Sequence, residues 1–231
     1  ELKALFAGAT ESIVRDMAGE FEKQSGHGLK ITYAPVGAIR DMIFAGEPAD
    51  LTIVTPAIIE QLQAKGLVRP GTAVAMGQVG GGIAVRQGAA RPAIGAAEEL
   101  KQALMAATEI HYADPKIATA GAYFLQVADR LGVTQEVRTK GRMAGSGKAS
   151  MELMAKSTAV AIGLTQISEI LSVKQVVLVG PYPGNLQRMT TYTGILLKDT
   201  PRAEAAEELL RFLASPPVQA RFREAGYEPA G

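Results

Sequence analysis

The sequence contains no cysteine among its 231 residues, and this absence removes several classes of site together. Disulfide scaffolds, zinc-thiolate and iron-sulfur sites, and thiol nucleophiles all need cysteine side chains. An excess of charge is also lacking, because 24 Lys and Arg residues stand against 23 Asp and Glu residues. A net charge of +1 does not favour a polyelectrolyte partner, so we expect no binding to nucleic acid.

Long hydrophobic runs are lacking as well. No stretch approaches the roughly 18 apolar residues that a membrane span needs. The chain opens directly on a strand-like segment, Leu2 to Phe6, and removal of an export signal would leave such a start, as would any other truncation. With 47% apolar residues, the chain is long enough for one large domain or two lobes around a sizeable core.

Short apolar runs that end at small residues alternate with helical patterns along the chain. Leu2 to Ala7 predicts a strand, and Ile13, Val14, Met17 and Phe21 follow at helical spacing. This alternation is typical of βα units around a largely parallel sheet, so the sequence predicts an α/β fold. Further strands are predicted at residues 29–34, 50–54, 83–85, 109–113, 160–164, 176–179 and 189–197.

Two segments interrupt this pattern. Glycines at 77, 80, 81 and 82 precede one extended stretch, and we interpret them as a flexible start of that strand. Gly180-Pro181-Tyr182-Pro183-Gly184 is a turn-rich break. Two crossings of the chain imply one lobe from residues 1–79 plus 187–231 and a second from 80–186. We expect a ligand cleft between the lobes and hinges near 78–82 and 181–188.

Two segments resemble nucleotide-binding motifs, but neither matches its motif completely. The segment from Gly145 to Ser150 resembles a phosphate loop, but Arg142 stands where the first glycine belongs and Ala149 replaces the Ser or Thr. The glycines at 77 and 80–82 do not give the G-x-G-x-x-G pattern of dinucleotide binding. We therefore expect no nucleotide cofactor.

Catalytic and metal-binding motifs are equally hard to find. His27 and His111 are the only histidines, and neither lies in an H-x-x-x-H pattern or near an Asp-rich calcium loop. A G-x-S-x-G elbow is missing, and no acidic pair lies on an evidently apolar wall. The sequence predicts no metal and no cofactor, and it favours a protein that is not an enzyme.

Small residues gather where predicted strands turn into helices. A helix begins with unpaired backbone N–H groups and a positive dipole end, so such junctions suit an anion. Helix caps and tight turns explain small residues too. Arg142 and Lys148 near one junction would add positive charge. The junctions are Ala9-Thr10, Val36-Gly37-Ala38, Thr119-Ala120-Gly121, Ser146-Gly147 and Leu164-Thr165.

Several short motifs are similar, in order and spacing, to those of one protein family. Gly46-Glu47-Pro48-Ala49-Asp50 is similar to a G-A-P-A-D run, and Asp114-Pro115 with Ala120 to Tyr123 is similar to a P-x-x-x-P-A-G-x-Y segment. Phe212 to Pro216 with Gly226-Tyr227 is similar to a terminal F-L-x-S-P…G-F pattern. On these motifs the chain resembles the periplasmic molybdate-binding proteins of ABC importers, which implies the two-lobed type II periplasmic-binding fold.

In that family, serine hydroxyls, backbone N–H groups and a tyrosine hold the oxyanion. The first serine position falls at Ala9 or Thr10, and a serine pair falls at Val36 and Gly37. Lys148 replaces an apolar residue, and Gln166 replaces the tyrosine. The resemblance thus implies these solute-contact residues: Ala9, Thr10, Val36, Gly37, Ala120, Gly121, Lys148, Thr165 and Gln166.

The resemblance implies a monomeric periplasmic receptor that closes its lobes on a small anion and presents it to an ABC permease. Because polar contacts differ from the family pattern, the solute stays open between a molybdate-like oxyanion, a small carboxylate and a neutral solute. A carboxylate would pair with Lys148 or Arg142. The alternative function is the ligand-sensing domain of a LysR-type transcription regulator, although no helix-turn-helix segment precedes Leu2.

Overall fold

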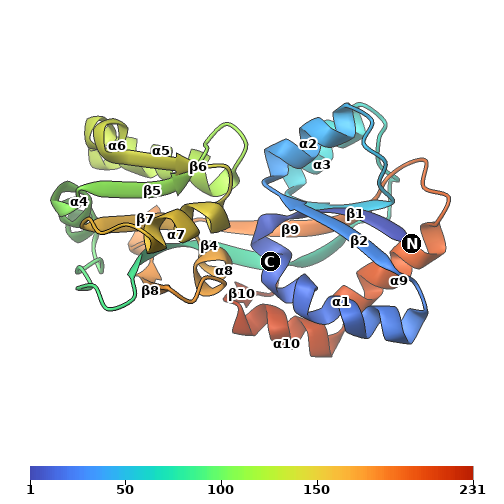
Figure 1. The fold of residues 1–231 in the computed structure, drawn as a ribbon. Coiled ribbons are helices and arrows are strands. Elements are labelled where there is room, and N and C mark those ends of the chain that lie inside the picture. Colours follow the sequence, from blue (N-terminus) through green and yellow to red (C-terminus); the bar gives the residue numbers. More distant parts are fainter. Residues whose placement is uncertain (231) are drawn as a thin grey trace. The chain divides into compact units, whose positions relative to one another are not determined.

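The computed structural model describes residues 1–230 and divides the chain into two compact units. Unit 1 consists of Glu1–Gln78 and Thr190–Gly231, and unit 2 consists of Val79–Met189. Each unit combines strands with flanking helices (Figure 1). The predicted α/β fold class is confirmed.

Unit 1 is built from both ends of the chain. Its strands are β1 (Leu2–Ala7), β2 (Leu29–Ala34), β3 (Leu51–Val54), β9 (Met189–Leu196) and β10 (Tyr227–Glu228). Its helices are η1 (Gly8–Thr10), α1 (Glu11–Ser25), α2 (Val36–Phe44), α3 (Pro56–Ala64), α9 (Ala203–Leu213) and α10 (Pro216–Glu224).

The strand β1 organises the sheet of unit 1, since it pairs in parallel with both β2 and β3. On the far side of β3, β9 runs antiparallel. The helices α2 and α3 cover one face of these strands, while α1, α9 and α10 cover the other (Figure 1). Both faces are thus shielded from water, as a largely parallel sheet requires.

Helix α1 shows how the apolar pattern becomes structure. Its residues Ile13, Val14, Met17 and Phe21 recur at helical spacing, and all four are buried. The helix ends at Gly26, whose φ of 74° lies in the left-handed region that glycine adopts without strain. The helix predicted from these residues is confirmed.

The Gly46 to Asp50 motif has a structural role in unit 1. Asp50 is 2% exposed, and its carboxylate accepts hydrogen bonds from the Lys3 backbone N–H at 2.8 Å and the Thr200 hydroxyl at 2.7 Å. The Arg202 guanidinium adds a contact at 3.3 Å. Burial alone raises the pKa of Asp50, but these donors outweigh it and hold the pKa below its usual value. The motif therefore ties the start of β3 to β1 and to the segment before α9.

Unit 2 consists of the middle of the chain. Its strands are β4 (Val74–Arg86), which begins in unit 1, β5 (Glu109–Ala113), β6 (Gly141–Ala144), β7 (Ala161–Gln166) and β8 (Val176–Pro181). Its helices are α4 (Ala97–Ala106), α5 (Thr119–Leu131), α6 (Thr134–Lys140), α7 (Gly147–Ala155), α8 (Ile167–Leu171) and the short η2 (Gly184–Leu186).

In unit 2 the strand β5 is central, because it pairs in parallel with both β6 and β7. The long strand β4 runs antiparallel to β7 and to β8. Apolar side chains from α4, α5 and α6 fill one core with Phe124 among its buried residues, and α7 and α8 close a second with Met151 and Met154. The helices α6 and α8 and the strand β6 were not predicted, because each is too short to show a clear period.

The structure corrects the interpretation of the glycines at 80–82 as a flexible start of a strand. They do not form a flexible start to a strand but lie inside the continuous strand β4. A Cβ at Gly81 would overlap the Tyr182 ring, and one at Gly80 would overlap the Gln187 carboxamide. The Gln187 side chain also donates to the Gly81 carbonyl at 2.8 Å and accepts its N–H at 3.0 Å. Close approach of neighbouring groups explains why glycine stands at these positions.

The turn-rich break predicted at Gly180 to Gly184 begins later than expected, because β8 extends to Pro181. Gly180 and Pro181 belong to β8 and pair with Ile83 and Gly82 of β4. Proline is tolerated there because it stands at the last position of the strand.

Candidate functional site

The candidate residues of unit 1 lie at one edge of its sheet. The residues Ala7 and Ala34, which end β1 and β2, are register partners. Because these strands are parallel, the turn that holds Ala9 and Thr10 lies next to the start of α2, which holds Val36 and Gly37. The structure thus brings the four candidate residues of unit 1 to neighbouring junctions.

Thr10 is fully buried, and its hydroxyl donates to the Ala7 carbonyl at 2.8 Å. A hydroxyl has one hydrogen, so the hydrogen predicted to face a solute is used to close the turn after β1. The neighbouring Ala9 carbonyl accepts a hydrogen bond from the Tyr227 hydroxyl at 2.9 Å, which ties this turn to β10. Both residues therefore stabilise the turn of unit 1.

Val36 and Gly37 form the buried first turn of α2. No side chain caps this helix start, whose preceding residue is Pro35. The first N–H groups of a helix lack partners within the helix, so this turn offers backbone donors and no hydroxyl or charge.

The candidate residues of unit 2 also share one edge. The strands β6 and β7 flank β5 in parallel, with Ala113 opposite Ala144. Their carboxyl ends lead into α5, α7 and α8, so the starts of these helices lie at the same edge. Ala120, Gly121, Lys148, Thr165 and Gln166 are thereby brought together within unit 2.

Gly121 sets how closely α5 approaches the sheet. A Cβ at this position would overlap the Ala113 carbonyl oxygen at the end of β5. The turn before α5 is held by Asp114, whose carboxylate accepts the Lys116 N–H at 2.9 Å. Only glycine lets α5 begin this close to β5, and Ala120 is half-buried in the same turn.

Lys148 is half-buried in the first turn of α7. The hydroxyl of Ser146 caps this helix and accepts the Ala149 N–H at 3.0 Å. A lysine at a helix start places two positive charges together, the ammonium group and the dipole end, which is unfavourable without an anion nearby. Lys148 is the candidate residue that adds a positive charge to this helix start.

A buried carboxylate lies next to the same turn and was missed by sequence reasoning. Glu169, in α8, is 8% exposed and accepts a hydrogen bond from the Thr165 hydroxyl at 2.9 Å. A Cβ at Gly147 would overlap both the Thr165 hydroxyl and the Glu169 carboxylate, so this pair lies directly against the start of α7. The only signal in the sequence was the spacing of a Thr and a Glu by four residues across the end of β7.

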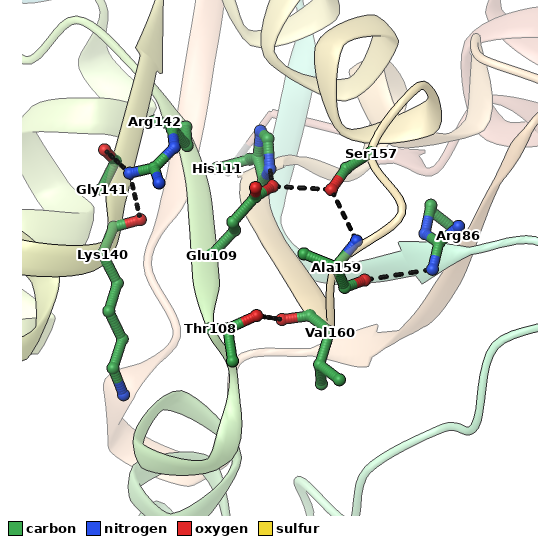
Figure 2. A network of polar contacts seen from close by, with 10 residues as sticks. All are labelled: Arg86, Thr108, Glu109, His111, Lys140, Gly141, Arg142, Ser157, Ala159 and Val160. Atoms are coloured by element: carbon green, nitrogen blue, oxygen red, sulfur yellow. Dashed lines mark hydrogen bonds and ion pairs between the residues drawn. The ribbon is translucent and has the colours of Figure 1, made fainter.

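Arg142 does not join this edge as a candidate anion contact. Its guanidinium Nη1 donates to the carbonyl oxygens of Gly141 at 3.1 Å and Lys140 at 3.3 Å, near the start of β6 (Figure 2). The same close view shows Glu109 and His111 of β5 and Ser157 after α7 in one polar network. The sequence pattern assigned His111 to no metal site and did not connect it with the other two.

Two properties of residues 1–230 concern metal binding and membrane insertion. Among them, no three His, Asp or Glu side chains gather in a way that would hold a metal ion. Within the same range, none of the helices combines the length and the apolar character needed to span a membrane.

Residues 2–228 match the profile of the bacterial extracellular solute-binding protein family. The chain belongs to this family. A relative in sequence is the aconitate isomerase of a Pseudomonas species, to which this solute-binding protein is 30% identical over 99% of its length and 87% of that protein.

Solved structures resemble this solute-binding protein along its whole length. The periplasmic molybdate-binding protein of Azotobacter vinelandii has a TM-score of 0.81 at 21% identity, with 100% of both chains covered. The sulfate-binding protein SubI of Mycobacterium tuberculosis has a TM-score of 0.78 at 15% identity, covering 99% of this chain and 86% of that one. The type II periplasmic-binding fold and the resemblance to molybdate-binding proteins are thus confirmed.

Proposed function

We propose that this solute-binding protein is the extracytoplasmic receptor of an ABC importer and captures a small organic anion that carries carboxylate groups. The observation that carries the proposal is Lys148, a half-buried ammonium group in the first turn of α7. A carboxylate beside this turn accepts backbone N–H groups and pairs with the lysine at the same time.

The other junctions favour a carboxylate over a tetrahedral oxyanion. An oxyanion such as molybdate needs many hydrogen-bond donors, but the Thr10 hydrogen is already used and Val36 and Gly37 carry no hydroxyl. The buried Glu169 carboxylate repels a fully ionised oxyanion held close to the start of α7. A solute with its charge spread over separate carboxylates suffers less from that repulsion.

The relative supports the same class of solute. The name of the Pseudomonas protein contains aconitate, which is a small tricarboxylate. At 30% identity along nearly the whole chain, a related anion is the natural first test. The proposal includes closure of the two units on the solute as the step that a permease recognises.

A thermal-shift screen tests this function. Molybdate, tungstate, sulfate and phosphate are compared with acetate, succinate, citrate and both isomers of aconitate. Binding at about one hundred times the dissociation constant adds roughly 2.7 kcal/mol of stability, which raises the melting temperature visibly. We expect shifts with di- or tricarboxylates. A shift with molybdate and tungstate alone would overturn the proposal, and small-angle scattering with the best solute tests the expected compaction.

A second candidate function is isomerisation of a small unsaturated tricarboxylate. The 30% identity to an aconitate isomerase over 99% of the chain favours it. Interconversion of double-bond isomers needs no oxidant or second substrate, but it needs a group that moves a proton. Glu169 and Lys148 are two titratable side chains at the edge of unit 2 where α7 and α8 begin.

Proton NMR of either aconitate isomer with the purified protein separates the two functions. Appearance of the other isomer, lost in Glu169→Gln, would establish the enzyme. Binding without conversion over hours would leave the receptor function.

A further inference from the structure

A pocket of about 350 Å³ lies in unit 2 at the edge opposite the starts of α5, α7 and α8. The start of β5, β6 and the end of α7 contribute to it (Figure 2). None of the candidate solute-contact residues lines it. Its walls include Glu109, His111, Arg142, Leu153, Lys156 and Ser157.

A partly buried network fixes the carboxylate of Glu109 in this pocket. His111 is 2% exposed, and its Nε2 lies 2.8 Å from Oε2 of Glu109. The Ser157 hydroxyl donates to the same oxygen at 2.7 Å. Among residues 1–230 the second oxygen, Oε1, makes no hydrogen bond, so one acceptor of an anchored carboxylate is left for a further donor.

Two cations line the same pocket. Arg142 uses Nη1 on carbonyl oxygens and keeps Nε and Nη2 without partners within the described chain. The ammonium group of Lys156, next to the end of α7, has no hydrogen bond or ion pair there either. Both side chains therefore retain donors for an anionic group.

These opposite charges lie near one another without pairing. Arg142 helps the Ser157 and His111 hydrogen bonds to lower the pKa of Glu109, so the two charges interact. Across the described residues, however, neither Arg142 nor Lys156 forms an ion pair with Glu109. A ligand that carries both charges would satisfy all three groups, whereas an anion or a cation alone would meet repulsion from one side.

We propose that this pocket is a second ligand site, specific for a small zwitterion of the amino-acid type. The ligand ammonium donates to Oε1 of Glu109, and its carboxylate accepts from Arg142 and Lys156. Leu153, at 45% exposed, offers an apolar wall to an aliphatic side chain. The volume of about 350 Å³ leaves room for such a side chain.

The two histidines make a direct test, because His111 lies in the pocket and His27 lies in unit 1. Histidine ring resonances are followed by NMR while glycine, acetate or methylammonium is added at constant ionic strength and pH. We expect glycine to shift the His111 resonances saturably in the millimolar range and to leave those of His27 unchanged. An equal response to acetate, or no response to glycine, would overturn the proposal.

Variants tie the response to the charges. Glu109→Gln and Arg142→Gln should each weaken glycine binding more than tenfold, whereas Glu152→Gln, on the exposed part of α7, serves as the matched control and should not. Circular dichroism checks the fold of each variant. Because Arg142 is exposed, its variant keeps the test valid if Glu109→Gln does not fold. Unchanged glycine affinity in Arg142→Gln would contradict the proposed contact between Arg142 and the ligand carboxylate.

Discussion

The helix starts of unit 1 and unit 2 arise from the same βα geometry but offer different chemistry. In unit 1, the Thr10 hydroxyl donates its hydrogen bond to the Ala7 carbonyl, and Val36 and Gly37 offer only backbone N–H groups. In unit 2, Lys148 and the Thr165–Glu169 pair add fixed charge of both signs. Backbone donors attract most small anions alike, whereas fixed charges in a set geometry select among them. We infer that unit 2 decides which solute is bound.

The largest expected effect follows from removing the charge of Lys148. Lys148→Ala should weaken binding of a carboxylate solute more than tenfold, because a charge-assisted hydrogen bond contributes about 1.5–3 kcal/mol. Isothermal titration calorimetry with the best solute measures it. Lys174→Ala, at an exposed lysine beyond the end of α8, is the control and should leave this affinity unchanged. Equal losses of solute affinity in both variants would mean that the net charge of the protein, and not the position of Lys148, determines binding.

Gly121→Ala tests the close approach of α5 to β5 in unit 2. The added methyl group meets the Ala113 carbonyl, so we expect a loss of about 1–3 kcal/mol in the free energy of unfolding, together with weaker solute binding. Gly19→Ala in α1 has open space around its Cβ and should instead gain about 0.5–1 kcal/mol. Urea denaturation compares the two. If Gly121→Ala left the free energy of unfolding unchanged, α5 would be able to move away from β5 without loss of stability.

The buried His111 gives unit 2 a dependence on pH. Burial, more than its contacts with Glu109, holds the pKa of His111 below its ordinary value of 6.5. Below pH 6.5 the unfolded chain therefore takes up protons that the folded chain does not, and stability falls as the pH drops through this range. The lowered pKa values of Glu109 and Asp50 add a second loss only at more acidic pH.

Chemical denaturation at pH 7.5, 6.5 and 5.5 checks this expectation. In His111→Gln the slope of stability against pH over this range should become flatter, even if the variant is less stable at each pH. A slope equal to that of the unchanged protein would assign the effect to other groups.

The smallest effect on binding should come from unit 1. Thr10→Val keeps the shape of the side chain but removes its hydrogen bond to Ala7, so stability should fall by about 1 kcal/mol. Solute affinity, measured by calorimetry, should change less than twofold, since the hydroxyl gives its hydrogen to the Ala7 carbonyl. A tenfold loss of affinity would break the contrast between the units.

Local sequence patterns were sufficient for most strands and for helix α1. The apolar spacing of α1 could be recognised because this helix runs over more than three turns and buries one face. The junctions with small residues could be found for a similar reason, since a parallel strand must turn into its helix within a few residues. What each polar side chain does at a junction could not be predicted, because its partner is distant in sequence or hidden in the next element.

The glycines at 80–82 and the pair Thr165–Glu169 illustrate that limit. Glycine in a strand fits both a hinge and a close contact, and only the positions of Tyr182 and Gln187 separate the two. Nothing local marks Glu169 apart from its spacing from Thr165, and only the tertiary structure places it against the start of α7.

The sequence by itself determined the alternation of strands and helices, the near-zero net charge and the lack of thiol chemistry. These are properties of composition and of periods that extend over a few residues. The tertiary structure decided that the hydrogen of Thr10 turns inward, that Glu169 lies against α7, and that Glu109, His111 and Ser157 meet in one pocket. Such outcomes depend on which strands become neighbours and in what register, and no local pattern carries that information.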